Sequence, residues 1–415
     1  MKRALLISYY SCLLVLPALG APKLTLSCGS NGIEHQMCEK AVKAWSKQTG
    51  VAVEVFSIPN DSNDRLAIYQ QFLGAGSPDV DVYQIDVVWP GLLASHFRDL
   101  KDEIPTAEIA AHLPEYIRNN TVQGRLVAVP WFADGGVLYY RKDLLKKHGL
   151  KPPSTWDDLE NAARTIAGKE KGMYGLVFQG RAYEGLTCNA LEWVASHGGG
   201  TIVDEDGRVS VNNPNSVKAL TRVAGWVGSL APTGVLGYSE EEARGVFQSG
   251  QAIFMRNWPY AWALLEADGS PVRGKVGIVP MPKTALGDHA STLGGWSLAV
   301  SKYSKFPKEA VELVRYLTGA EQQRIRSLEA SFNPTIVALY DDPTLLAKNP
   351  HLKVLKSALA SAIPRPSRQT RQKYNRVSAE LWNTVHAILS KTETPEVGLA
   401  SLEKRLVSHS NGGKW

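Results

Sequence analysis

The chain has 415 residues, a formal net charge of +6 at pH 7 and 44% hydrophobic residues. This length favours two or more lobes with separate hydrophobic cores. No Lys/Arg-rich block with interleaved aromatic residues occurs, so the weak positive charge does not support a nucleic-acid-binding protein.

The first twenty residues have the pattern of an export signal. Lys2 and Arg3 precede an apolar stretch over residues 4–16, and small residues lie just before Ala21. The sequence therefore predicts a cleaved signal peptide over residues 1–20 and a periplasmic protein. A membrane anchor is the alternative, but the apolar stretch is shorter than the roughly 20 residues that a span requires.

Three cysteines remain after the predicted cleavage: Cys28, Cys38 and Cys188. An exported compartment permits a disulfide, and Cys28 with Cys38 could close a small loop between the first strand and the first helix. Because the number is odd, we favour the alternative of three buried free thiols. Their spacing supports no metal site.

Strand and helix patterns alternate from the start of the predicted mature chain. Residues 24–26 open a strand, apolar residues over 33–45 recur at helical spacing, and valines alternate over 51–55 as a second strand. A helix over 66–73 and a strand over 79–86 follow. This alternation predicts a parallel sheet covered by helices on both faces.

Further elements follow after residue 125. The sequence predicts a short strand over 126–130 that stops at its proline, a strand over 137–140, and a helix over 143–150 that ends at a glycine. The capping pairs Thr155 with Asp158 and Ser239 with Glu242 each predict the start of a helix. Pro307 and Pro395 predict the starts of two further helices.

Two tryptophans lie in segments that do not have a core pattern. Trp258 lies inside RNWPYAW and Trp296 ends TLGGW, and each is framed by Pro, Gly, Asn or Arg beside a strand-like run. Ligands in open α/β sheets bind beyond the carboxyl ends of strands, where Asp86 and residues 131–134 are also expected. A crevice between two lobes would collect these groups from distant parts of the chain.

Several segments together resemble the bacterial extracellular solute-binding proteins of ABC importers, and most closely the trehalose/maltose-binding proteins. They are PDVDVYQIDVVWPG (78–91), AVPWFADGGVLYYRKDLL (128–145), KPPSTWDDL (151–159), FQGRAYEGLTCNALEWVASHGG (178–199), FQSGQAIFMRNWPYAW (247–262), GKVGIVPMP (274–282), TLGGWSLAVSKYSK (292–305) and PHLKVLKSALASAIPRP (350–366). The resemblance covers nearly the whole mature chain.

This resemblance implies an α/β, two-lobed periplasmic-binding-protein fold of type II. Each lobe is expected to be a mostly parallel sheet flanked by helices, with the ligand cleft at the hinge. The implied division places residues 21–130 in the N-terminal lobe, 131–293 in the C-terminal lobe, 294–336 in the hinge and the return to the N-terminal lobe, and 337–415 in the C-terminal lobe.

The resemblance also implies which positions line the cleft. These are Glu34, Arg65, Asp86, Phe132, Asp134, Trp258, Tyr260, Gly294, Gly295, Trp296 and Arg365. Phe132 departs from the pattern, because several relatives have a tyrosine there. Carboxylates and guanidinium groups suit the hydroxyls of a neutral sugar, and flat rings suit its C–H faces.

Each candidate also has a structural alternative. Trp258 and Trp296 could fill hydrophobic gaps, Asp86 and Glu34 could stabilise helix starts, and the two arginines could be surface charges.

The sequence thus predicts a monomeric periplasmic solute-binding protein, without cofactor, metal or catalytic residues, that delivers an α-linked glucose disaccharide to a membrane permease. Trehalose is the first choice of ligand, then maltose or sucrose. The main alternative is an exported glycoside hydrolase acting on α-glucosides, and a binding protein for an oligopeptide or polyamine is another. GWSLA (295–299) and GSPVRGKV (269–276) are incomplete matches to a nucleophile elbow and a phosphate loop.

Overall fold

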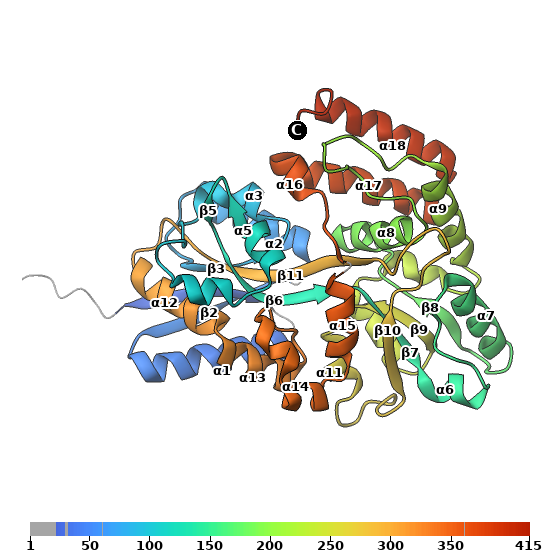
Figure 1. Ribbon diagram of the computed structural model, residues 1–415, viewed down its shortest axis with the longest axis horizontal. Helices are drawn as coiled ribbons and strands as arrows, with labels where there is room; N and C mark the ends of the chain where they lie inside the picture. The colour runs from blue at the N-terminus through green and yellow to red at the C-terminus, as the bar shows by residue number, and fades with distance from the viewer. Residues whose placement is uncertain (1–21, 30–31, 60, 361) are drawn as a thin grey trace, which may run out of the picture.

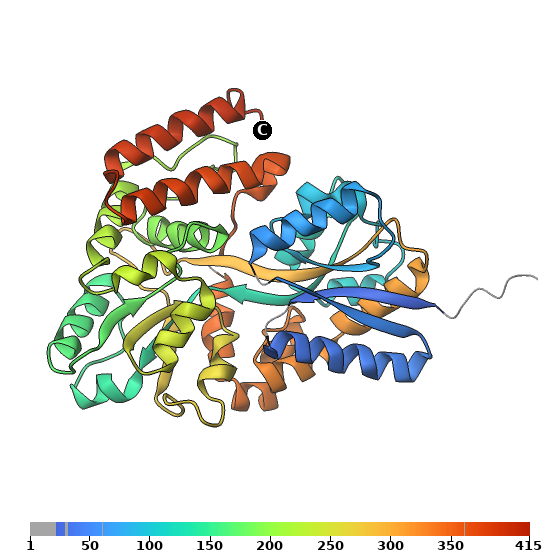
Figure 2. The same cartoon turned by 180° about the vertical axis from the view of Figure 1, so that it is seen from behind.

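The computed structural model describes residues 22–29, 32–59, 61–360 and 362–415. The chain forms two α/β lobes that lie side by side and are joined by long central strands (Figure 1 and Figure 2). The predicted signal peptide, residues 1–20, lies outside the described residues. Within the described ranges no helix has the length and apolar character needed to cross a membrane.

The first lobe is built on a six-stranded sheet. Its strands are β1 (Lys23–Gly29), β2 (Ala52–Ile58), β3 (Val82–Asp86), β6 (Val129–Gly135), β11 (Ser291–Val300) and β12 (Ala362–Ile363). The order is β12-β11-β3-β1-β2, and β6 also pairs with β11. β1 is parallel to both neighbours and β11 is parallel to β12, whereas β11 is antiparallel to β3 and β6.

Both faces of this sheet are buried under helices. Leu24 and Leu26 of β1 belong to one core, whereas Tyr83 and Ile85 of β3 belong to the core on the other face. The helices of this lobe are α1 (Gly32–Thr49), α2 (Ser62–Gly74), α3 (Pro90–Leu93), η1 (Ala94–His96), α4 (Thr106–Ala110), α5 (Pro114–Asn120), α12 (Pro307–Thr318) and α13 (Ala320–Ala330). A small hairpin of β4 (Thr121–Val122) and β5 (Arg125–Leu126) accompanies them.

The second lobe has a four-stranded sheet of order β10-β7-β9-β8. Its strands are β7 (Val137–Arg141), β8 (Tyr174–Val177), β9 (Ala252–Asn257) and β10 (Val276–Pro280). The expected α/β class is confirmed, but the expectation of a mostly parallel sheet is wrong for this lobe. Only β8 and β9 are parallel, because β7 enters directly from the crossing strand β6 and runs opposite to both of its neighbours.

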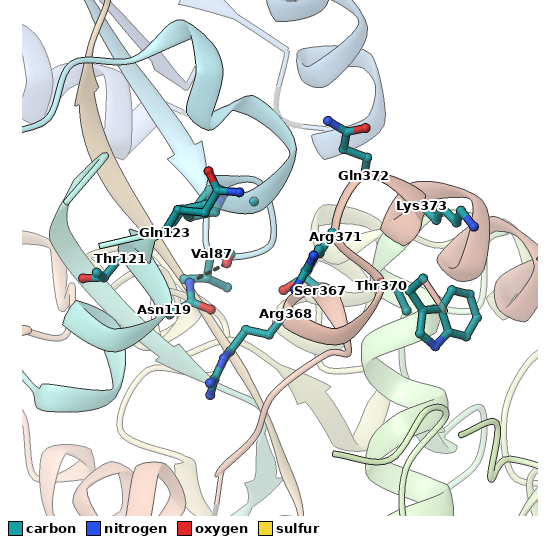
Figure 3. Close-up of a pocket in the computed structure, with 14 residues that line it drawn as sticks. Val87, Asn119, Thr121, Gln123, Ser367, Arg368, Thr370, Arg371, Gln372 and Lys373 are labelled. Atoms are coloured by element: carbon teal, nitrogen blue, oxygen red, sulfur yellow. Dashed lines mark hydrogen bonds between the residues drawn. The ribbon is translucent and has the colours of Figure 1, made fainter. Parts of the chain in front are cut away.

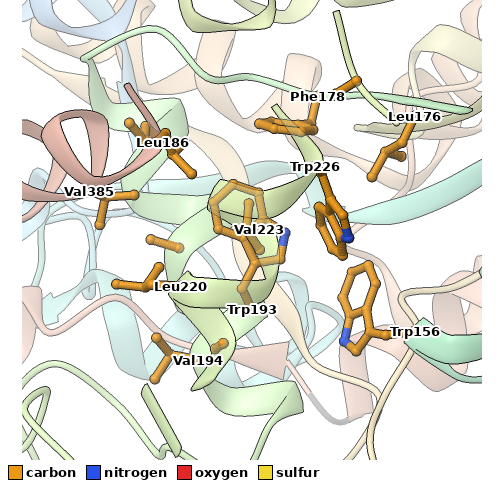
Figure 4. Packing of buried hydrophobic residues seen from close by; sticks show 14 of the residues in the cluster. Trp156, Leu176, Phe178, Leu186, Trp193, Val194, Leu220, Val223, Trp226 and Val385 are labelled. Atoms are coloured by element: carbon orange, nitrogen blue, oxygen red, sulfur yellow. The ribbon is translucent and has the colours of Figure 1, made fainter. Parts of the chain in front are cut away.

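The core of the second lobe is rich in tryptophan (Figure 4). Trp156, Trp193 and Trp226 are almost fully buried, and the indole N–H of Trp156 donates to Ser196 Oγ at 2.9 Å. The helices around this sheet are α6 (Lys142–Lys147), α7 (Trp156–Ala167), α8 (Glu184–Ser196), α9 (Pro214–Trp226), η2 (Thr233–Gly237), α10 (Glu240–Gln248), α11 (Ala261–Leu265), α17 (Tyr374–Leu389) and α18 (Pro395–Ser410). The capping boxes predicted at Thr155 and Ser239 are both present.

The chain crosses between the lobes three times, through β6 into β7, through β11, and through the segment from β12 to α16 (Ser367–Thr370) and η4 (Arg371–Lys373). The boundaries expected at 130/131 and 293/294 fall inside β6 and β11. η3 (Val337–Asp341) and α14 (Pro343–Lys348) pack with α15 (His351–Ala360) against residues of the first lobe such as Leu113 and Leu328.

Two local expectations were wrong. The strand expected to stop at Pro130 runs through it. Pro130 lies beside a β-bulge in β6, because Phe132 pairs with Trp296 and Pro130 pairs with the next residue, Ser297, so that Trp131 is the extra residue. A missing N–H disturbs the ladder least at such a bulge. Cys28 and Cys38 form a disulfide, and only Cys188 is a buried free thiol among the described cysteines. The end of β1 and the first turns of α1 bring Cys28 and Cys38 together.

Candidate ligand-binding site

A cavity of about 170 Å³ lies between the two lobes, and every predicted site residue lines it. The first lobe supplies Glu34, Arg65, Asp86, Phe132 and Asp134. The second lobe supplies Trp258 and Tyr260, and the crossing segments supply Gly294, Gly295, Trp296 and Arg365. The fold thus brings together residues that are separated by more than 300 positions in the sequence.

Glu34 enters the cavity from the first turn of α1, where the helix dipole stabilises a negative charge. Its Oε1 accepts a hydrogen bond of 2.5 Å from Gln84 Nε2. Gly29 makes room for it, because a Cβ at that position would lie 2.3 Å from Glu34 Oε2 and 2.9 Å from Arg65 Nη2. A small residue at the end of β1 therefore lets Glu34 and Arg65 converge.

Arg65 is only 1% exposed, which excludes the reading of this residue as a surface charge. Its guanidinium lies 4.2 Å from the ring centroid of Trp296, and its Nε donates to Pro59 O at 3.0 Å. Arg65 Nη1 is buried and has no hydrogen-bond partner among the described residues. A buried donor in this position is available to a ligand hydroxyl.

Arg365 joins carboxylates from both lobes. Its Nη2 donates to Asp86 Oδ1 at 2.9 Å, and its Nη1 donates to Glu184 Oε1 at 2.7 Å. Glu184 also accepts from Ser378 Oγ at 2.7 Å and from the hydroxyl of Tyr374. The Arg365 side chain is 3% exposed, so it is a buried link between the lobes and not a surface charge.

Asp134 lies at the end of β6 and is largely buried. Burial raises the pKa of its carboxyl to about 8, and the nearby Glu34 carboxylate adds to the rise. Within the described ranges, the Asp134 carboxyl accepts one hydrogen bond, a long one of 3.4 Å from Asn333 Nδ2. At neutral pH this carboxyl is therefore mostly protonated and can donate as well as accept, in contrast to the ionised group expected from the sequence.

The aromatic side chains of the second lobe are held by their polar edges. Trp258 Nε1 donates to Glu240 Oε1 at 3.2 Å, and the Tyr260 hydroxyl donates to Glu241 Oε1 at 2.6 Å. The Arg256 guanidinium lies 3.9 Å from the Trp258 ring centroid, and Arg256 is paired with the buried Glu192. These contacts fix the orientation of the ring faces.

Trp296 lies inside β11. The pairing of β11 with β6 is interrupted beside it by a β-bulge whose extra residue is Trp131 of β6, and Gly295 has a positive φ of 117°. A Cβ at Gly295 would lie 2.4 Å from Phe132 O, and a Cβ at Gly294 would lie 3.0 Å from Trp258 Cζ3. The two glycines therefore let β6 and Trp258 pack against β11.

Phe132 forms an aromatic wall with Phe332, at 4.8 Å between ring centroids. Behind both rings lies the guanidinium of Arg326, which is 2% exposed and whose three nitrogens find no hydrogen-bond partner in the part of the chain that the structure describes. Burial lowers the pKa of Arg326 to about 10. The wall is apolar on the cavity side, as a phenylalanine in place of tyrosine predicts.

Several cavity residues were missed from the sequence. They are Ile33, Asp61, Ser62, Arg181, Tyr183, Glu184, Gly185, Cys188, Ser239, Glu240, Glu241 and Phe332. Glu184 opens α8 and Glu240 opens α10. The capping pair at Ser239 was the one sequence signal that marked such a helix start.

The enzyme motifs considered from the sequence find no support in the described residues. Ser297 of GWSLA is fully buried in the middle of β11, and its Oγ accepts from Asn120 Nδ2 at 2.8 Å. Val276 of GSPVRGKV begins β10 and not a helix. The described chain also holds no group of three or more His, Cys, Asp or Glu side chains placed to bind a metal ion.

Comparisons with known proteins agree with this architecture. The model of the bacterial extracellular solute-binding protein family matches residues 37–324. A probable ABC transporter-binding protein of Deinococcus radiodurans is 50% identical over 400 residues, which cover 95% of each chain.

Two solved structures have the same fold. The maltose-bound MalE3 of T. maritima is 40% identical, with a TM-score of 0.89 over 93% of this chain and 99% of that one. The GacH receptor of Streptomyces glaucescens is 24% identical, with a TM-score of 0.83 over 94% of this chain and 98% of that one, and supports the fold alone. The resemblance seen in the sequence is confirmed, and the chain belongs to the bacterial extracellular solute-binding proteins.

Proposed function

We propose that this protein is the periplasmic solute-binding component of an ABC importer and that its ligand is an α-linked glucose disaccharide. Trehalose is the first candidate, followed by maltose or sucrose. The observation that carries the proposal is the convergence of Trp258, Tyr260 and Trp296 with carboxyl and guanidinium groups in one cavity between two lobes.

The chemistry of the cavity suits a neutral polyol. Glu34 and Asp86 offer acceptors, Arg65 offers an unused donor, and the mostly protonated Asp134 offers both. The indole and phenol rings suit the C–H faces of a sugar. The maltose bound by MalE3 of T. maritima, whose sequence is 40% identical, supports the same ligand class.

A ligand held by both lobes favours the closed arrangement, since it loses contacts when the lobes separate. In this proposal the closed, sugar-loaded monomer is the form that the membrane permease subunits recognise. The 50% identical ABC transporter-binding protein of Deinococcus radiodurans supports this partner.

Calorimetric titration of the purified protein with trehalose, maltose, sucrose and palatinose tests the proposal. We expect saturable binding of at least one of the four, with one site per chain. No binding of any of them, together with binding of an oligopeptide or polyamine, would refute the ligand class.

The exported glycosidase is the second candidate, and one observation favours testing it. Asp134 has the raised pKa that a general acid requires, and it lies near Glu34. Glucose release from trehalose and maltose should therefore be followed over hours. We expect none, and release in proportion to protein that is lost in Asp134→Asn would establish the enzyme instead.

A further inference from the structure

A second cavity lies on the other side of the crossing segments from the candidate sugar site. Asp86 lines the sugar cavity, and the next residue, Val87, lines the second cavity. Likewise, Arg365 lines the sugar cavity and Ser367 lines the second cavity. This cavity measures about 500 Å³. We call it the basic groove and define it by Asn119 and Gln123 of the first lobe with Arg368, Arg371, Lys373 and Trp415 from the C-terminal part of the chain (Figure 3).

The groove carries more positive than negative charge. Its described lining includes two arginines and a lysine, whereas its negative charge is limited to the α-carboxylate of Trp415, since no aspartate or glutamate is part of it. An adjoining cavity shares Arg368 and Arg371 and contains Glu205 and Asp206, of which Asp206 is already paired with Arg208. The groove is therefore a local excess of cations.

The two arginines differ from the others near the hinge. Arg365 is buried and paired with two carboxylates, whereas the exposed guanidinium groups of Arg368 and Arg371 make no ion pair or hydrogen bond with the described residues. Lys373 is partly engaged, because its Nζ donates to His409 O at 2.8 Å. The guanidinium groups of Arg368 and Arg371 therefore keep all of their N–H donors for a ligand.

The backbone of the groove holds one strained conformation. Gln123 and Arg371 both line the groove with positive φ, but Gln123 lies with Gly124 in the two-residue turn between β4 and β5, where positive φ is ordinary. Arg371 has φ 48° and ψ −121°, a conformation that glycine adopts more readily than arginine. Such outliers persist where the surrounding structure enforces them, often at ligand sites.

The opposite wall is polar but uncharged. Asn119 Nδ2 donates to Val87 O at 2.6 Å, which fixes its amide beside the groove (Figure 3). On the side of the arginines, the Trp415 indole N–H donates to Gly207 O at 2.6 Å, so this ring too has a fixed orientation. Amide groups and an aromatic face can receive the organic part of a small molecule whose anionic part binds the arginines.

We propose that the basic groove is a binding site for a phosphate ester. The planar fork of arginine matches phosphate oxygens, and two unpaired forks on one short segment can hold one phosphoryl group. The volume lies within the range of small-molecule sites and exceeds what one inorganic phosphate fills. This site is separate from the sugar cavity and does not depend on the proposed sugar ligand.

The test is titration of the full mature chain with glucose 6-phosphate at low ionic strength. A second arm measures binding to vesicles of phosphatidylcholine with and without phosphatidylglycerol, because an anionic lipid headgroup presents a phosphate diester. The variant is Arg368→Ala with Arg371→Gly, in which the glycine relieves the backbone strain and protects folding. The control, Arg273→Ala with Arg315→Ala, removes the same charge at exposed ion pairs elsewhere.

We expect saturable binding to the wild type and to the control, and binding weaker by about tenfold or more in the groove variant. The bound ester should also raise the melting temperature of the wild type but not of the groove variant. Groove-dependent binding to phosphatidylglycerol vesicles alone would identify the source as a lipid headgroup. No binding in either arm, or equal binding by the groove variant, would overturn the proposal.

Discussion

Asp61 of the first lobe forms an ion pair with Arg181 of the second lobe across the candidate sugar cavity. Asp61 is the N-cap of α2, where its Oδ1 accepts from the Asn63 N–H at 2.8 Å. Arg181 follows β8, and its guanidinium lies 5.0 Å from the Tyr183 ring centroid. The pair links the lobes in the arrangement seen here.

Arg181→Ala should weaken sugar binding by about twofold to fivefold, because a half-exposed ion pair contributes at most about 1 kcal/mol. The pair should also make affinity fall with added salt. Titrations at low and high salt measure both effects. Arg273→Ala, which removes a pair far from the cavity, is the control. An affinity and a salt dependence equal to those of the wild type would show that the pair does not assist closure.

Trp258→Ala and Trp296→Ala should each weaken binding of the disaccharide by about tenfold or more, since a stacked ring contributes about 1 kcal/mol beyond its buried area. Tyr174→Ala removes an exposed ring outside the cavity and should leave the affinity unchanged. Calorimetry gives the dissociation constants. If neither tryptophan variant loses affinity, these rings do not contact the ligand.

Arg365→Ala should lower the free energy of unfolding by about 3–5 kcal/mol, because it leaves Asp86 and Glu184 buried without their common partner. Arg368→Ala, three residues later and without an ion pair among the described side chains, should change it by less than about 0.5 kcal/mol. Urea unfolding without ligand distinguishes them. Equal stability of the two variants would mean that the cluster contributes nothing to the fold.

Asp134 should make the stability of the ligand-free protein depend on pH. Its pKa is about 8 in the folded chain against an ordinary value of 3.8, so the folded chain binds the proton more tightly. The stabilisation that the Asp134 carboxyl contributes to the folded state is complete below pH 3.8 and is lost as the pH rises towards and through 8. Asp134→Asn should therefore lose less stability between pH 6 and 9 than the wild type, as measured by urea unfolding. Parallel pH profiles would contradict the raised pKa.

The Cys28–Cys38 disulfide closes a short loop between positions 10 residues apart. Replacing both cysteines by serine should lower the free energy of unfolding by about 2–3 kcal/mol, from the entropy of the unfolded loop. Dithiothreitol should destabilise the wild type by a similar amount and leave the double variant unchanged. A wild type insensitive to reduction would show that the bond contributes no stability.

Much of the fold could be predicted from patterns within short windows. The capping pairs at Thr155 and Ser239, and the prolines that open α12 and α18, are local signals that act within one helical turn. Strand direction in the second lobe was not predictable in this way. It depends on where β7 enters the sheet, and no residue of β7 encodes that by itself.

The candidate site, like the fold, could be predicted from the sequence only in part. Family motifs marked Trp258, Asp86 and Arg365 as residues of one cleft, and all three line one cavity. The sequence left the role of Arg365 open, because its pairing with Glu184 joins positions 181 residues apart. Asp61 carried no signal, and Arg181 was not marked as a site residue although it lies in the matched segment 178–199. A polar residue before a helix and an arginine after a strand are ordinary in loops.

The sequence by itself determined the α/β class, the family and the residue types of the cleft, because periodicity, capping and motifs are properties of neighbouring residues. Only the tertiary structure decided the disulfide, the direction of β7, the protonation of Asp134 and the two cavities on either side of the crossing strands. Each of these depends on distances and burial between segments remote in the chain, which the order of residues constrains only through the complete fold.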